Sequence, residues 1–87
     1  MSVQMGLDRL QPLQRGIVMS VGGEEAMKRR LEELGIIRGT VIECVMISPL
    51  GDPVAYRIRG SVVALRRKDA AGIMICPYGE ANDGEAV

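Results

Sequence analysis

The spacing of hydrophobic residues differs between segments of the chain, and the difference separates one helix from a set of short strands. In the segment GEEAMKRRLEELG, apolar residues recur at Met27, Leu31 and Leu34, a spacing that places them on one face of an α-helix. Gly35 can end this helix in the left-handed conformation, and Ile36 is then placed to fold back onto Leu31. The pattern predicts one amphipathic helix with a single apolar stripe.

Five other segments have the continuous or alternating apolar pattern of short β-strands: residues 16–21, 40–48, 54–59, 61–66 and 73–76. The alternation is clearest in VAYRIR, where Val54, Tyr56 and Ile58 share one face of the strand and Arg57 and Arg59 share the other. Closure of five short strands hides the edges that an open sheet would expose. We therefore expect a mainly β fold, a small, partly closed β-barrel of about five strands with one capping α-helix and short helical turns.

Two stretches outside these segments predict the short helical turns. Near the start, Leu7, Leu10 and Leu13 are spaced by three residues, which indicates either one helical turn or an apolar lip that seals a core. Pro12 limits any longer helix there. The sequence KDAAG, residues 68–72, predicts a second single turn before the last strand.

The composition fits one small domain followed by a tail. Apolar residues make up 47% of the 87 residues and are almost all aliphatic, since the chain has two tyrosines and neither phenylalanine nor tryptophan. Aliphatic side chains can fill a small core at native density. Residues 77–87 contain three acids and no base, which leaves residues 1–76 with eleven bases and eight acids. We predict a domain over residues 1–76 and an acidic, disordered tail over residues 77–87.

The sequence also predicts where the protein works. The first fifteen residues contain charged side chains and no long apolar run, so they do not have the pattern of a signal peptide. No apolar segment approaches the roughly 20 residues needed to span a bilayer. We expect a cytoplasmic protein without direct membrane insertion.

Catalysis and nucleotide binding find little support in the residues. The chain has no histidine, so the common base-activated nucleophiles are missing, and we predict that it is not an enzyme. The segment GGEEAMK resembles a glycine-rich loop leading into a helix, but Glu24 and Glu25 occupy the place of the phosphate. We expect no cofactor, apart from a transition-metal ion as the weaker alternative.

The two cysteines are the only soft metal ligands besides methionine. Cys44 shares a predicted strand face with Ile42 and Met46, and Cys76 lies in another apolar strand. They are 32 residues apart and do not form the CxxC pairs typical of zinc sites. We interpret them as reduced core thiols; a disulfide or a metal site is the alternative, and its ligands are unknown.

The basic residues allow two interpretations. They lie on the predicted helix (Lys28, Arg29, Arg30), on one strand face (Arg57, Arg59) and after the next strand (Arg66, Arg67, Lys68). They form either an ordinary solvated surface or a positive patch that meets an acidic partner. Nucleic acid is disfavoured as that partner, because single-stranded binders need aromatic stacking platforms and this chain has almost none.

The stretch SPLGDP, residues 48–53, describes a stiff hairpin turn. Pro49 and Pro53 fix φ and reduce the freedom of the unfolded loop, and Gly51 permits a positive φ. Asp52 is expected to bond the backbone of its own turn. Leu50 is then either tucked against the barrel or displayed as an apolar contact for a partner.

The order of these signals resembles the ferrous iron transport protein A (FeoA) family. The family pattern is a helix that ends in Leu-Gly, a Gly before a strand, a Pro-Leu-Gly-Asp-Pro turn, a strand ending near Gly, an Ala-Leu-Arg strand and an Ala before a final Ile-rich strand. The resemblance covers roughly residues 7 to 76, and the matching positions are Arg30, Leu31, Leu34, Gly35, Gly39, Pro49, Leu50, Gly51, Asp52, Pro53, Gly60, Ala64, Leu65, Arg66 and Ala70.

This resemblance implies an SH3-like β-barrel, in agreement with the element order above. It also implies a cytosolic accessory of bacterial ferrous iron uptake that binds the cytosolic GTPase part of the membrane transporter FeoB and modulates it. For this binding we predict contact by Leu50, Gly51, Asp52, Arg30, Leu34, Arg57 and Arg59, with the leucines supplying apolar area and the arginines steering. Weak homo-oligomerisation is also allowed for. The alternative functions are a metal-ion-binding or metal-sensing module and a nucleic-acid-binding SH3-like barrel.

Overall fold

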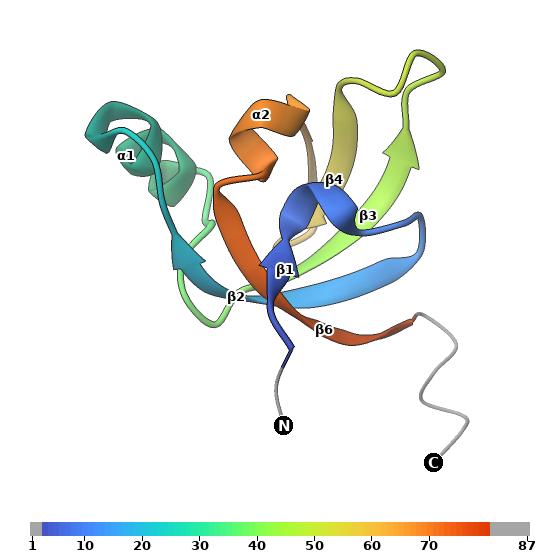
Figure 1. Ribbon diagram of the computed structural model, residues 1–87, viewed down its shortest axis with the longest axis horizontal. Coiled ribbons are helices and arrows are strands. Elements are labelled where there is room, and N and C mark those ends of the chain that lie inside the picture. Colours follow the sequence, from blue (N-terminus) through green and yellow to red (C-terminus); the bar gives the residue numbers. More distant parts are fainter. Residues whose placement is uncertain (1–2, 81–87) are drawn as a thin grey trace.

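The computed structural model describes residues 3–80, and within this range six antiparallel strands form one sheet (Figure 1). The strands are β1 (Met5–Gly6), β2 (Gln14–Val21), β3 (Val41–Ile47), β4 (Val54–Ile58), β5 (Ser61–Leu65) and β6 (Ile73–Glu80). They are hydrogen-bonded in the order β1-β6-β2-β3-β4-β5. The helical elements are the 3-10 turn η1 (Leu7–Arg9), helix α1 (Glu25–Glu33) and the short helix α2 (Arg67–Ala70).

The sheet curves around a core of aliphatic side chains. The alternation predicted for β4 is confirmed, because Val54, Tyr56 and Ile58 are all at most 1% exposed. The other fully buried side chains come from the remaining longer strands and from the helical elements: Leu7, Leu10, Val18, Leu31, Ile36, Ile42, Cys44, Ala70, Ile73 and Ile75. Elements far apart in the sequence therefore share one core.

Of the three N-terminal leucines, two are buried and the third is exposed. Leu7, the first residue of η1, and Leu10, which follows η1, are both buried, as expected for a lip that seals the core. Leu13 is exposed, with a positive φ of 76°, because it lies in the turn that leads into β2. Its backbone N–H donates to the carbonyl of Cys44 at 2.8 Å, which fixes this turn against β3.

A β-bulge changes the predicted face of one residue in β3. Cys44 pairs with Tyr56, but Met46 pairs with Ala55, so β3 carries one extra residue at this point. The bulge reverses the alternation, and Met46 is 57% exposed although Ile42 and Cys44 are buried. The prediction that all three residues share one face is wrong for Met46, since sequence periodicity does not reveal a bulge.

The predicted strand number and the predicted end of the domain also need correction. All five predicted strands are present, but the two-residue β1 was missed because so short a strand has no period. The last strand continues past Cys76 to Glu80, and Pro77 lies opposite Gly16 next to a register shift in the β2–β6 pairing, where a missing N–H is tolerated. Residues 77–80, predicted as the first part of the disordered tail, therefore belong to β6, and the rest of the predicted tail, residues 81–87, lies outside the described residues.

Helix α1 ends as its sequence predicts and packs through a narrow stripe. The N–H groups of Gly35 and Ile36 donate to the carbonyls of Glu32 and Leu31, both at 2.9 Å, the bonds of a Schellman motif. Leu31 is 1% exposed, whereas Leu34 is 39% exposed. The helix stands at one side of the curved sheet (Figure 1) and leaves part of its apolar stripe uncovered. None of the helices in residues 3–80 is long and apolar enough to cross a membrane.

Candidate functional site

The connection between β3 and β4, residues 48–53, forms a tight turn that we call the hairpin tip. The N–H of Gly51 donates to the carbonyl of Ser48 at 2.7 Å, and Pro49 occupies the second position of this turn, where its fixed φ is favoured. Gly51 has φ of 90°, which a residue with a side chain would adopt only under strain. Leu50 is 95% exposed. Of the two predicted positions of its side chain, tucked against the barrel or displayed to solvent, the structure has the second.

The hairpin tip is braced by Arg67, at the start of α2. The backbone N–H of Arg67 donates to Asp52 Oδ1 at 2.9 Å, and its side-chain Nε donates to the carbonyl of Gly51. Its Nη1 donates to the carbonyl of Asp8 in η1 at 2.9 Å. One partly buried side chain thus ties the tip to two other elements, and charge-assisted bonds of this kind are stronger than neutral ones.

Two titratable side chains, those of Tyr56 and Cys44, are buried beneath the tip. Tyr56 is fully buried and its hydroxyl donates to the carbonyl of Leu7 at 3.4 Å. Burial raises the pKa of the Tyr56 phenol well above its usual range, and the neighbouring Cys44 adds to the rise. Burial also raises the pKa of the Cys44 thiol, although Arg67 opposes it. Both groups therefore stay neutral at physiological pH, and Cys44 is a core thiol instead of a reactive one.

A second surface lies between α1 and β5, which we call the α1–β5 groove. One wall is α1, with Met27, Arg30, Leu34 and the buried Leu31 at its base, and the other is the β5 segment from Val63 to Arg66. Asp69 of α2 closes one end. The groove has a volume of about 340 Å³, and its two walls come from parts of the chain about 30 residues apart.

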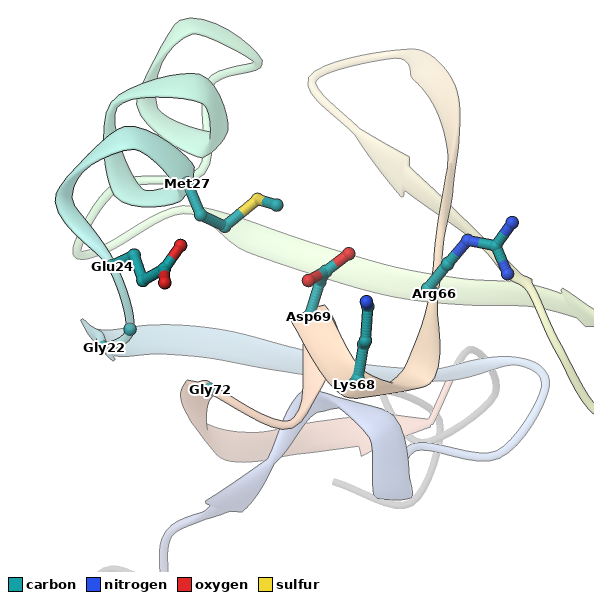
Figure 2. Close-up of a pocket in the computed structure, with 8 residues that line it drawn as sticks. Gly22, Glu24, Met27, Arg66, Lys68, Asp69 and Gly72 are labelled. Atoms are coloured by element: carbon teal, nitrogen blue, oxygen red, sulfur yellow. The ribbon is translucent and has the colours of Figure 1, made fainter.

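The groove continues toward the start of α1 into a wider depression of about 520 Å³, and the two share Met27, Arg66 and Asp69. The carboxylates of Glu24 and Asp69 point into the space between α1 and α2 (Figure 2). Within residues 3–80, however, no three Cys, Asp or Glu side chains gather as a metal site would require. Lys68 lies next to Asp69 (Figure 2) and Arg66 also lines the depression, so the depression carries both signs of charge.

The cysteines do not come together into a metal site with other ligands in the described part of the chain. Cys44 is buried in β3, and Cys76 is half-buried in β6, opposite Ile17 of β2. Both are free thiols, as predicted for reduced cysteines. Metal binding by this chain stays a prediction without an identified ligand set.

The structure divides the seven predicted partner-binding residues among four places. Leu50, Gly51 and Asp52 form the tip, whereas Arg30 and Leu34 line the α1–β5 groove. Figure 1 shows the tip and α1 on opposite sides of the molecule, so they do not form one continuous surface.

The two predicted strand arginines also separate. Arg57 lies on the outer face of β4 and forms an ion pair with Glu43 of β3 at 3.5 Å. Arg59 is not in β4 but in the two-residue turn before β5, with φ of 52°, and its side chain lies against Gly35. The prediction that both lie on one strand face is wrong, because the strand ends at Ile58.

Sequence reasoning missed Arg67 and misplaced the bond of Asp52. Asp52 accepts from the backbone of Arg67, 15 residues away, instead of from its own turn. In the sequence, Arg67 stands between Arg66 and Lys68 and looks like part of an ordinary basic surface. No local pattern distinguishes it, since all its partners come from other elements.

Comparison with known proteins gives a consistent result. The sequence matches the FeoA domain family over residues 5–77. It is 38% identical over 71 residues to a Porphyromonas gingivalis protein described as an Fe(2+) transport protein A/Fe(2+) transporter FeoB fusion protein. The match covers 82% of this chain and 8% of that fusion protein, so this chain spans only a small part of the relative's length.

Two solved structures are similar over most of the chain. The solution structure of the FeoA protein from Chlorobium tepidum is 36% identical, with a TM-score of 0.82, and the match covers 86% of this chain and 71% of that one. The Stenotrophomonas maltophilia FeoA, crystallised with zinc and described as an SH3 domain protein, is 29% identical with a TM-score of 0.72, covering 82% and 88%. The predicted SH3-like fold is thereby confirmed.

Proposed function

Because the chain belongs to the FeoA family, we propose that it is a non-enzymatic accessory of bacterial ferrous iron uptake, which docks through the hairpin tip on the cytosolic GTPase part of a FeoB-type transporter and modulates it. The observation that carries this proposal is the 95% exposure of Leu50 on a tip braced from below by Arg67. A large apolar side chain held in water on a rigid support is suited to enter a pocket on another protein.

The brace reduces the entropy that docking costs. A flexible loop loses conformational freedom when it binds, whereas a tip fixed by the Ser48–Gly51 turn and by Arg67 has lost it already. Full burial of a leucine contributes about 1.5–3 kcal/mol, which corresponds to roughly a tenfold to hundredfold change in affinity. Leu50 alone therefore accounts for a measurable part of a weak regulatory contact.

The Porphyromonas gingivalis relative supports the choice of partner. In that protein the FeoA-like part and a FeoB transporter are joined in one chain. Fusion raises the effective concentration of two modules for each other, which favours a contact between them. Arg30, Arg57 and Arg59 are assigned the steering of encounter, since long-range attraction does not require that they touch the partner.

An NMR titration of the ¹⁵N-labelled protein with the transporter's cytosolic domain tests this proposal. We expect shifts centred on residues 48–53 and a loss of affinity of about tenfold or more in Leu50→Ser, because the substitution removes the buried apolar area. Val41→Thr is the matched control, as Val41 is an exposed apolar residue on β3 away from the tip, and we expect it to bind normally. An unchanged affinity of folded Leu50→Ser, or the absence of binding by the wild-type protein, would refute docking through the tip.

A further inference from the structure

The sheet has two edges, and they differ in how they are protected. One edge is β1, which has only two residues before the chain turns into η1. The other is β5, which has five residues and pairs with β4 alone among the described strands. Short edge strands are a common protection against unwanted pairing, and β5 lacks it.

The hairpin geometry shows which backbone groups β5 offers. The turn between β4 and β5 has two residues, Arg59 and Gly60, and Ile58 pairs with Ser61 across it. In such a hairpin the pair next to the turn exchanges both hydrogen bonds, and every second pair does so after it. Val62 and Ala64 occupy the alternate pairs, so their N–H and C=O groups point away from β4, and both residues are exposed.

The α1–β5 groove runs along this same edge. Val63, Ala64 and Leu65 line one side of it, and the apolar face of α1 with Met27 and Leu34 stands opposite. An extended segment laid against β5 would bond Val62 and Ala64 through its backbone, and every second side chain would reach the face of α1. The groove thus provides both parts of a strand-addition site, an unpaired ladder and an apolar wall.

Charge determines which segment fits. Arg59 precedes β5 and Arg66 follows it, so the edge is basic at both ends. If two copies of this chain paired through β5 in antiparallel fashion around Val63, Arg66 of each would lie opposite Gly60 of the other, next to its Arg59, and like charges would repel. A second copy is therefore disfavoured, and a strand with acidic residues on either side of an apolar centre is complementary.

We propose that the α1–β5 groove is a second binding surface, which takes an extended peptide segment with an apolar centre and acidic flanks as an additional strand on β5. The segment belongs to a partner protein, and the site is separate from the hairpin tip on the opposite side of the molecule. The proposal does not rest on the transporter contact, because its evidence is the edge, the groove and the two arginines.

A peptide library displayed on phage tests the proposal with the whole protein as bait. Random decapeptides are selected on the immobilised chain, and the enriched sequences are synthesised and titrated against ¹⁵N-labelled protein. We expect enrichment of alternating apolar residues with Asp or Glu on both sides, and slowed amide hydrogen exchange at Val62 and Ala64. No enrichment, enrichment without acidic residues, or binding that shifts the hairpin tip instead of β5 would overturn the proposal.

Matched variants sharpen this test. Ala64→Pro removes the edge N–H and Ala64→Ser keeps it, so we expect the first to lose peptide affinity about tenfold or more and the second to bind normally. Arg66→Glu leaves the backbone edge intact but reverses one flanking charge, and we expect the same direction of effect for the acidic peptide. If Ala64→Pro does not fold, the peptide affinity of Arg66→Glu and the hydrogen exchange of Val62 and Ala64 in the wild-type complex test the proposal instead. Leu50→Ser should bind the peptide unchanged, and a loss there would also count against a separate site.

Discussion

The hairpin tip and the α1–β5 groove both present apolar side chains to solvent, but they are built in opposite ways. The tip is convex, comes from six consecutive residues and displays one leucine that is 95% exposed. The groove is concave and is assembled from α1 and β5, with Leu31 of its helical wall only 1% exposed. The comparison indicates that a small barrel can carry a local, rigid projection on one side and a composite recess on the other, and that the two should respond differently to substitution.

The largest difference is expected from the two leucines. Leu31→Ala should lower the free energy of unfolding by about 2–5 kcal/mol, because it leaves a cavity in the core beneath the groove wall. Leu50→Ala should change the same free energy by no more than about 0.5 kcal/mol, because its side chain is already in water. Urea denaturation of both variants measures this contrast. Equal small effects would mean that α1 is not anchored through Leu31, and the groove would then have no fixed wall.

The next largest effect concerns Arg67. Arg67→Ala should lower the free energy of unfolding by about 1–3 kcal/mol, because charge-assisted bonds to Gly51 and Asp8 are lost. It should also speed the hydrogen exchange of the Gly51 amide while leaving β5 unchanged, since the side chain of Arg67 bonds the tip and η1 but not β5. Arg66→Ala is the matched control, because Arg66 is next to Arg67 in the sequence but lines the groove. Comparable acceleration at Gly51 in the control would show that the tip does not depend on Arg67.

The smallest expected effect is a loss of stability at high pH, and it comes from Tyr56, in the part of the core beneath the tip. Because the folded state raises the pKa of Tyr56, the unfolded chain loses this proton first as the pH rises above about 10. Stability that is fully present below that pH should then fall, by up to about 1.4 kcal/mol per pH unit for this group. Tyr56→Phe should flatten the decline, measured by urea denaturation between pH 8 and pH 11. Tyr78→Phe is the control, because this second tyrosine is exposed, and an equal flattening there would contradict the assignment.

Much of the fold follows from short-range patterns that the printed sequence contains. The stripe of Met27, Leu31 and Leu34 predicts α1, and Gly35 with Ile36 predicts the Schellman motif that ends it. The alternation in residues 54–58 predicts which side of β4 is buried. These signals are readable because helix and strand periods relate residues that are only two to four positions apart.

The features that the sequence did not predict also have physical causes. The bulge between Cys44 and Met46 reverses which side chains of β3 are exposed, although no residue type in the strand indicates it. Strand β6 continues past Pro77 at a register shift in its pairing with β2. In both cases a neighbouring strand decides the outcome. The pattern of one strand alone therefore gives its type more reliably than its end or its face.

The same division holds for the two surfaces. The residues of SPLGDP were enough to specify a stiff turn, and the ordered motifs from Leu31 to Ala70 were enough to indicate the family. The exposure of Leu50, the brace from Arg67 to a carbonyl 59 residues earlier, and the recess between α1 and β5 arise only when distant segments meet. Turn chemistry acts over a few bonds of the backbone, whereas a brace or a groove depends on which elements the core brings side by side.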